Sequence, residues 1–209
     1  NVSVSAWVKT DDDGNNKWVL SAGSLASPVN ISSFTIGKRH SNDAFFSVGA
    51  IWYAHIAYGG NINDGDWHHI AGTYNGSTIT CYVDGTAGTG VSDTEAVAAA
   101  GLVTVGATSS TTGSTLTGHW DGSIDEVAVW SVCLSAADVT AIYNSGEPTD
   151  LTDSGSYDTD RSSNLVLYIR NGDGDENGTG STVYDASGID NDIVLVNMEN
   201  GDYKSDVPS

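Results

Sequence analysis

Acidic and amide side chains at alternate positions near the C-terminal end could hold a metal ion. The string Asp173-Gly-Asp-Glu-Asn-Gly178 places side-chain oxygens two residues apart before a glycine, as in the opening of an EF-hand calcium loop. The twelfth position of such a loop should be a glutamate, but Tyr184 stands there and Asp185 follows it. No helix pair flanks the string. Two interpretations remain: an ordinary acidic turn, or a calcium site with the ligands Asp173, Asp175, Asn177 and Asp185.

Aromatic side chains gather in the stretch Ile51-Trp-Tyr-Ala-His-Ile-Ala-Tyr58. An exposed ring can stack on the apolar face of a sugar, and polar neighbours can bind the hydroxyls. If the stretch is a strand, alternation puts Tyr53 on the face of His55 and Trp52 on the opposite face. At least one ring should then lie in the core. The stretch predicts a ligand site formed by Trp52, Tyr53, His55 and Tyr58 but identifies no particular glycan.

Two adjacent histidines, His68 and His69, could also bind a metal ion or act as an acid or base. Neighbours on a strand face opposite ways, so they cannot act on one ligand together. His69 shares its face with Trp67, and we expect it to be a hydrogen-bonded histidine beside a core tryptophan.

The charge balance restricts the partners. Against 7 basic residues the 209-residue chain has 27 acidic ones, a formal charge of -20. Such a surface repels phosphate backbones and anionic lipid, so we expect no nucleic acid partner. No apolar run reaches the ~20 residues that a bilayer span needs, so we expect no membrane insertion. The charge itself has two interpretations, solubility in a salty medium or several calcium sites.

Short stretches with period-two alternation predict an all-β fold. They include Ile124 to Trp130, and turn residues separate them. The clearest unit, Ile70 to Gly85, reads as a hairpin with its turn at Asn75-Gly76. Cys81 and Cys133 lie among apolar neighbours, and we expect both to be small buried residues. The pattern leaves open whether they are paired.

One helix is predicted within Leu134-Ser-Ala-Ala-Asp-Val-Thr-Ala-Ile-Tyr-Asn-Ser-Gly146. Ser135 can cap its first turn together with Asp138, and Gly146 follows its end. Residues 147–163 are polar and turn-rich and read as a linker. Residues 164–169 then form another strand, and a second apolar stretch lies at 193–196.

Five motifs in order resemble laminin-G-like, concanavalin A-like jelly rolls. They are Val2-Ser-Val-Ser-Ala-Trp-Val8, Gly65-Asp-Trp-His-His-Ile-Ala71, Tyr82-Val-Asp-Gly85, Gly122-Ser-Ile-Asp-Glu-Val-Ala-Val-Trp130 and Leu134-Ser-Ala-Ala-Asp138. The resemblance implies a two-sheet antiparallel jelly-roll sandwich with one short helix.

The C-terminal part resembles the strand and loop that usually precede the first of these motifs. Either a second copy begins at Asn164 and is cut off, or residues 164–209 supply strands to the same sandwich. We favour the latter, since a lone strand would leave an exposed edge. The expectation is a single domain of residues 1–209.

Catalysis must be considered, because the family that this chain resembles also includes glucanases. A retaining glycosidase needs two carboxyl groups about 5 Å apart. In glucanases of the family that this chain resembles, a strand with the pattern Glu-x-Asp-x-x-Glu supplies these groups. The nearest string, Ser123-Ile-Asp-Glu-Val127, lacks this pattern. Asp125 and Glu126 are adjacent and should point to opposite faces. We therefore predict that the protein is not an enzyme, with a glycoside hydrolase as the weakest of the alternatives.

The resemblance also implies a structural calcium held by an Asp near this late strand, here Asp125, with Asp121 assisting. The alternative is a solvated carboxylate at a strand end.

The closing strings Asn171-Gly-Asp-Gly-Asp175, Val196-Asn-Met-Glu-Asn-Gly-Asp202 and Asp206-Val-Pro208 resemble tails of laminin-G-like structural proteins of marine bacteriophages. The predicted function is a non-catalytic attachment or assembly module on the virion surface, as a capsid decoration or a tail or fibre protein. Its partners would be other virion or surface proteins and glycans. The alternative is a secreted, extracellular bacterial adhesin or lectin. A homo-oligomer is compatible with either setting.

Overall fold

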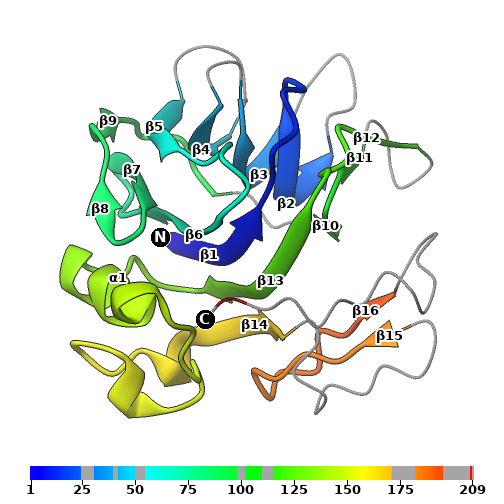
Figure 1. Cartoon of the computed structure of the whole chain (residues 1–209). Coiled ribbons are helices and arrows are strands. Elements are labelled where there is room, and N and C mark those ends of the chain that lie inside the picture. The colour runs from blue at the N-terminus through cyan, green and yellow to red at the C-terminus, as the bar shows by residue number, and fades with distance from the viewer. Residues whose placement is uncertain are drawn as a thin grey trace.

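The computed structural model describes residues 1–24, 31–39, 42–49, 55–97, 102–109, 115–170, 182–194 and 208. These residues form two antiparallel sheets packed face to face (Figure 1). The larger sheet has the strand order β14-β13-β1-β6-β7-β8, with β9 also paired to β7, and the smaller one has the order β10-β2-β3-β4-β5. The predicted two-sheet jelly roll with one short helix is confirmed for this part of the chain.

The bounds of the strands agree with the alternating stretches of the sequence. The larger sheet consists of β1 (Val2–Lys9), β6 (Trp67–Tyr74), β7 (Thr78–Val83), β8 (Thr86–Ala87), β9 (Val91–Ser92), β13 (Ser123–Trp130) and β14 (Leu165–Ile169). The smaller sheet consists of β2 (Lys17–Ser24), β3 (Ile31–Lys38), β4 (Asp43–Val48), β5 (Ile56–Asn61) and β10 (Val103–Val105). Two short hairpins are formed by β11 (Thr108–Ser109) with β12 (Leu116–Thr117), and by β15 (Thr182–Val183) with β16 (Ile193–Val194).

The main core lies between the two sheets. It takes alternate residues of each strand, such as Val4 and Val8 from β1 and Phe46 and Val48 from β4. Gly72 of β6 is required there, because a Cβ at this position would lie 2.1 Å from Cγ of Phe46. Each strand therefore has an inner face in this core and an outer face turned away from it.

The predicted hairpin is confirmed. In β6 and β7, Tyr74 pairs with Ile79 and Ile70 with Val83. The Asn75 carboxamide accepts the amide hydrogens of Ser77 and Thr78 at 2.9 and 2.8 Å, which closes the turn.

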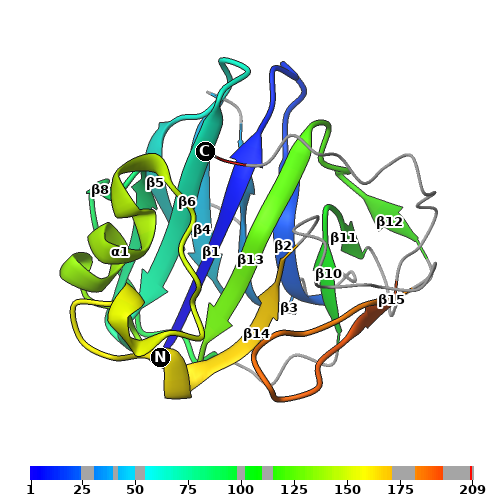
Figure 2. The same ribbon diagram turned by 60° about the horizontal axis from the view of Figure 1, so that its bottom comes forward.

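The outer face of the larger sheet is covered by α1 (Ala136–Tyr143) and the connection that follows it (Figure 2). The predicted capping box is confirmed, because the Ser135 side chain accepts the amide hydrogen of Asp138 while the Asp138 carboxylate accepts that of Ser135. The helix ends at Asn144, whose backbone is in the left-handed conformation with φ 48°.

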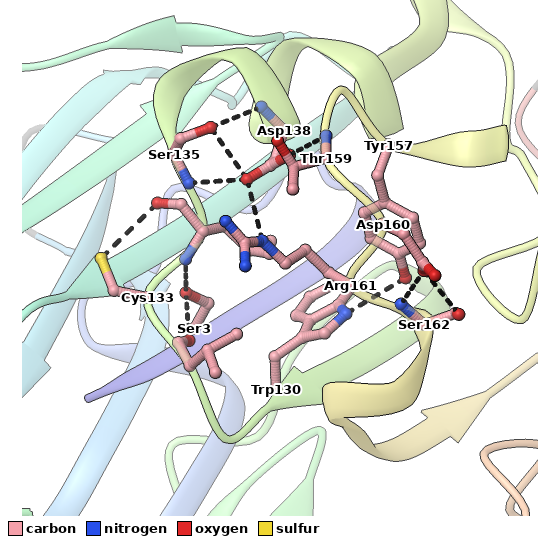
Figure 3. Close-up of polar contacts among 12 residues, drawn as sticks. Ser3, Trp130, Cys133, Ser135, Asp138, Tyr157, Thr159, Asp160, Arg161 and Ser162 are labelled. Atoms are coloured by element: carbon pink, nitrogen blue, oxygen red, sulfur yellow. Dashed lines mark hydrogen bonds and ion pairs between the residues drawn. The ribbon is translucent and has the colours of Figure 1, made fainter. Parts of the chain in front are cut away.

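The connection of residues 147–163 is packed against the sheet. It contains the short turn η2 (Ser154–Ser156) and most of η3 (Ser162–Asn164), which ends one residue beyond it. Asp138 binds the connection through the amide of Thr159 at 2.8 Å and the guanidinium of Arg161 at 3.4 Å (Figure 3). The indole N–H of Trp130 donates to the hydroxyl of Tyr157 at 3.1 Å in the same region (Figure 3). The segment thus completes a second apolar cluster on this face.

The C-terminal segment contributes an edge strand to the larger sheet. β14 pairs antiparallel with β13, where Val127 faces Ile169 and Val129 faces Leu167. Val183 of the β15–β16 hairpin lies in the main core. The assignment of all of residues 164–209 to one domain stays a prediction, because much of this segment lies outside the described residues.

Among the described residues no helix is both long and apolar enough to cross a bilayer. Cys81 is buried and Cys133 is half-buried, and neither forms a disulfide. The expectation that both are buried therefore holds only for Cys81.

Candidate functional site

The predicted ligand residues are only partly within the described chain. Trp52 and Tyr53 lie outside it. Tyr58 lies on β5 and is 41% exposed. His55 precedes β5, and its Nδ1 pairs with the buried Asp93 carboxylate. Asp93 also accepts the amide hydrogen of Glu95 at 2.7 Å, so His55 joins a structural contact at the rim, whereas Tyr58 is exposed on the sheet.

Aromatic side chains cross the outer face of the smaller sheet in one row. Trp18 of β2 pairs with Gly37 of β3, Gly37 pairs with Phe45 of β4, and Phe45 pairs with Tyr58 of β5. We call Trp18, Phe45 and Tyr58 the aromatic row. A Cβ at Gly37 would lie 2.1 Å from the Lys17 carbonyl oxygen, so no side chain separates Trp18 from Phe45. Trp18 packs against Phe45 and Ile56 in a small cluster of their own.

A second row, made of hydroxyl side chains, lies beside the aromatic row at the next outward positions along the strands. Thr104 pairs with Ser21, Ser21 with Thr35, and Thr35 with Ser47. We call Thr104, Ser21, Thr35 and Ser47 the hydroxyl row. Their strand neighbours Ala22, Phe34, Ile36, Phe46 and Val48 are in the main core, so alternation puts the hydroxyls on the outer face.

The two ends of the hydroxyl row differ. At the β2 end, the Ser21 hydroxyl is hydrogen-bonded to that of Thr108 at 3.0 Å, and the main chain of Trp18 donates to the Gly118 carbonyl at 3.1 Å. Thr35 donates to the Leu20 carbonyl at 3.0 Å. At the β4 end, the buried Ser47 hydroxyl has no hydrogen-bond partner. The β11–β12 hairpin therefore packs on one end of the face, while at the β4–β5 end Ser47 and Phe45 are buried and Tyr58 is exposed.

The face contains two unpartnered polar atoms, the Ser47 hydroxyl oxygen and the Trp18 indole nitrogen. Buried polar atoms are normally hydrogen-bonded, because an unmade bond costs the full desolvation penalty of about 1–3 kcal/mol. An indole N–H can only donate, and a hydroxyl can donate or accept. Both atoms are buried, so among the described residues of the two rows Tyr58 is the exposed one that a ligand can reach.

Sequence reasoning named Tyr58 as a candidate but did not name Trp18, Ser47 or the other residues of the two rows. Local alternation marks a residue's face, but the rows depend on which strands are neighbours and on their register. The signal in the sequence was the unusual set of hydroxyl residues at outward positions of apolar strands, as in Ser33, Thr35 and Ser47.

The two adjacent histidines have opposite environments. His68 lies between two carboxylates, with Nδ1 2.7 Å from Asp84 and Nε2 3.1 Å from Asp64. The Asp84 hydrogen bond, aided by that of Asp64, raises the pKa of His68 to about 9 against the opposing effect of burial.

His69 is buried between rings of the outer face, 5.3 Å from Trp7 and 6.2 Å from Tyr143 between ring centroids. The expectation of a hydrogen-bonded side chain beside Trp67 is wrong, since Nδ1 has no partner and the neighbouring core tryptophan is Trp7. Burial lowers the pKa of His69 to about 4, so the ring is neutral.

The expectation that Asp125 and Glu126 point to opposite faces is also wrong. The β1–β13 register shifts between Ser5 and Trp7, where β13 has one extra residue and Glu126 adopts φ 50°. This bulge breaks the alternation. Asp125 pairs with Trp7, and the Glu126 carboxylate accepts from the Tyr168 hydroxyl, so both lie on the outer face.

Both carboxyl groups are nevertheless inaccessible. Asp125 is 2% and Glu126 4% exposed. Burial raises the pKa of Glu126 to about 7, although Tyr168 and Arg170 oppose that shift. The guanidinium of Arg170 lies 3.2 Å from Glu126. The pair is part of the packed face and not of an open cleft.

The described metal candidates do not converge on one point. Asp121 is exposed, and its main-chain carbonyl accepts from Thr10 at 2.6 Å. The Asp185 carboxylate accepts hydrogen bonds from the main chain of Tyr168, Ser187 and Asn191 and from the Ser187 hydroxyl. Within the described ranges no three acidic, histidine or cysteine side chains are arranged to hold a metal ion. Asp173, Asp175 and Asn177 lie outside those ranges.

The comparison with protein families agrees with this architecture. Residues 1–140 match the family described as the concanavalin A-like lectin/glucanases superfamily, and the chain belongs to that superfamily. No curated protein matches the sequence.

Solved structures with the same fold include several proteins. A candidate carbohydrate-binding protein from Bacteroides ovatus is 18% identical with a TM-score of 0.63, and the match covers 93% of this chain and 52% of that one. The heptameric SAP-like pentraxin of Limulus polyphemus is 16% identical with a TM-score of 0.55, over 68% and 69% of the two chains. The CBM40 of the Ruminococcus gnavus IT-sialidase is 15% identical with a TM-score of 0.55, over 68% and 82%. The chain thus spans about half the length of the first of these proteins.

Proposed function

We propose that the protein is a non-catalytic module that binds a neutral glycan on the outer face of the smaller sheet. The observation that carries this proposal is Tyr58, a ring 41% exposed at the β5 end of the aromatic row. Tyr58, exposed at the β5 edge, would stack on the sugar ring.

The accessible part of the described face is small, because Tyr58 is exposed whereas Phe45, Ser47 and Ile56 are buried. One exposed ring can stack on the apolar face of one sugar unit. Similarity in fold to a candidate carbohydrate-binding protein and to the CBM40 of a sialidase supports a binding role of this kind.

The charge of the chain favours a neutral ligand. A formal charge of -20 gives a negative potential over the surface, which opposes the approach of sialylated or sulfated chains. Neutral glycans do not meet this barrier, and their binding should depend little on ionic strength.

The buried state of Asp125 and Glu126 supports the absence of catalysis. A glycosidase needs one carboxyl group to protonate the leaving oxygen and another to attack or to activate water, and both must contact the substrate. These two groups lie within the packed outer face of the larger sheet. We therefore expect no release of reducing sugar from β-glucans.

The setting of the module stays a prediction. A virion surface, with attachment or assembly as its task, and a secreted adhesin would both use a glycan-binding face. Calcium also stays a prediction, both at the loop of Asp173, Asp175 and Asn177 and at Asp125 with Asp121; within the described residues no group of three acidic, histidine or cysteine side chains is arranged to hold a metal ion. If that loop holds calcium, the ion should raise the melting temperature above a control with sodium at equal ionic strength.

A glycan array with matched aromatic variants tests the proposed function. Tyr58→Ala should weaken binding, whereas Tyr184→Ala should leave it unchanged, because Tyr184 is similarly exposed at 43% but lies on the β15–β16 side. Loss of one stacked ring should weaken binding by roughly tenfold or more. Binding that survives Tyr58→Ala but is lost in Tyr184→Ala would contradict the proposed face, and binding to acidic glycans alone would contradict the ligand class.

A further inference from the structure

Lys38 ends β3 with a side chain that is completely buried, which is unusual for lysine. Its Nζ contacts three oxygens from three loops. The main-chain carbonyl of Asp12 accepts from it, as does the side-chain oxygen of Asn63 at 2.7 Å, while that of Asn42 is 3.4 Å away. A primary amine is therefore enclosed against a carboxamide at the rim of the sandwich.

The carboxamide of Asn63 is held from its other side by a carboxylate. Its Nδ2 donates to Oδ1 of Asp13 at 3.1 Å, and its own main-chain amide donates to Asn61 at 2.9 Å. Asn63 thus lies between a potential nucleophile on its oxygen side and a potential proton acceptor on its nitrogen side. Asn42 differs, because its main-chain amide donates to the Arg39 carbonyl and among the described residues no carboxylate contacts its side-chain nitrogen.

Charged groups around Lys38 act in opposing directions. Burial lowers the pKa of the ammonium, and Lys17 adds to that effect, while Asp12 and Asp13 raise it. The net direction is downward, which increases the fraction of neutral amine with a free lone pair.

We propose that Lys38 and Asn63 form an intramolecular isopeptide bond with Asp13 as the catalytic carboxylate. Lys38 first loses one proton to solvent. The carboxamide of Asn63 rotates slightly, and the lone pair of Lys38 Nζ then forms a bond to Cγ of Asn63. The Cγ–Nδ2 bond then breaks, and Nδ2 leaves as ammonia with the second amine proton, carried by the Asp13 carboxylate.

The step is balanced, because amine and carboxamide give a secondary amide and ammonia without an oxidant or co-reactant. The bond would tie β3 to the loop between β5 and β6 across a sequence separation of 25 residues. It would fix the rim of the smaller sheet covalently, a property independent of the glycan-binding face.

Intact-mass spectrometry of the full chain tests the proposal. The expected mass is lower than the sequence mass by one ammonia, and a chymotryptic digest should contain a branched peptide that joins Lys38 to Asn63. Asn63→Ala and Lys38→Met should restore the sequence mass of each variant. Asn42→Ala is the matched control and should keep the ammonia loss. Asp13→Asn should slow the loss in freshly purified protein.

Three results would overturn the proposal. An unchanged wild-type mass means that Lys38 is only a hydrogen-bonded ammonium. An ammonia loss that persists in Lys38→Met points to succinimide formation at an Asn–Gly pair such as Asn75-Gly76. A branched peptide through Asn42 assigns the bond elsewhere. The wild-type digest decides the question even if a variant fails to fold.

Discussion

The outer faces of the two sheets use polar groups in different ways. On the larger sheet, α1 and residues 147–163 cover a cluster around Trp130 and Tyr168, and its polar side chains largely bond to one another. On the smaller sheet, Trp18 and Ser47 have polar atoms without partners beside the exposed Tyr58. The larger sheet thus has an outer face packed by α1 and the connection, whereas the described outer face of the smaller sheet includes the exposed ring of Tyr58.

This difference between the two outer faces predicts different effects of substitution. Substitutions on the covered face should change the free energy of unfolding, and substitutions at exposed positions of the other face should change binding. His69, whose Nδ1 is unpartnered beneath α1, is the exception on the covered face.

The largest expected effect is that of Trp130→Ala. The side chain is completely buried and packs edge-on against Tyr157 at 6.4 Å between centroids. We expect a loss of about 3–5 kcal/mol in the free energy of unfolding, from lost burial and the cavity left behind. Denaturant titration measures it, with Tyr58→Ala as the control at less than about 0.5 kcal/mol. Comparable losses in both variants would remove the distinction between the faces.

A smaller effect is expected for Asp138→Asn. Burial opposes ionisation of this carboxyl, but hydrogen bonds from Thr159, Ser135 and Arg161 outweigh it and lower its pKa. The substitution should cost about 1.5–3 kcal/mol, because charge-assisted bonds to the connection are lost. Asp158→Asn, at an exposed position of the same connection, is the control.

The pH dependence of this contribution follows from the direction of the shift. A lowered pKa means that the contribution is present above the ordinary value of 3.8 and is lost as the pH falls through the lower folded value. In acid, Asp138→Asn and wild type should therefore approach each other in stability. A constant difference at all pH values would contradict the role of the ionised carboxylate.

The smallest of the three effects concerns His68. Its pKa is raised from 6.5 to about 9, so its contribution is fully present below pH 6.5 and is lost as the pH rises through 9. The melting temperature of wild type should fall over this window, and His68→Gln should flatten that fall. His119→Gln, at an exposed histidine, serves as the control. An identical pH profile for His68→Gln and wild type would exclude the two ion pairs as the source.

The sequence predicted the elements better than the site. Alternation and turn residues located the strands, and the Ser135–Asp138 capping box located the helix, because these signals are local. Asp125 and Glu126 were placed on opposite faces because a bulge has no clear local signal. The aromatic row escaped prediction for a related reason: Trp18 and Tyr58 are brought into one row only by the order of the strands between them.

The most direct test of the account is a titration of ¹⁵N-labelled protein with the neutral glycan that binds best on the array. Indole N–H signals allow one reporter on each face, Trp18 on the smaller sheet and Trp130 beneath the connection. We predict the largest shifts for the Trp18 indole and the amides of Ser47 and Tyr58, with the Trp130 indole unchanged. Shifts concentrated at Trp130 and α1, with the Trp18 signal unmoved, would contradict the proposed binding face.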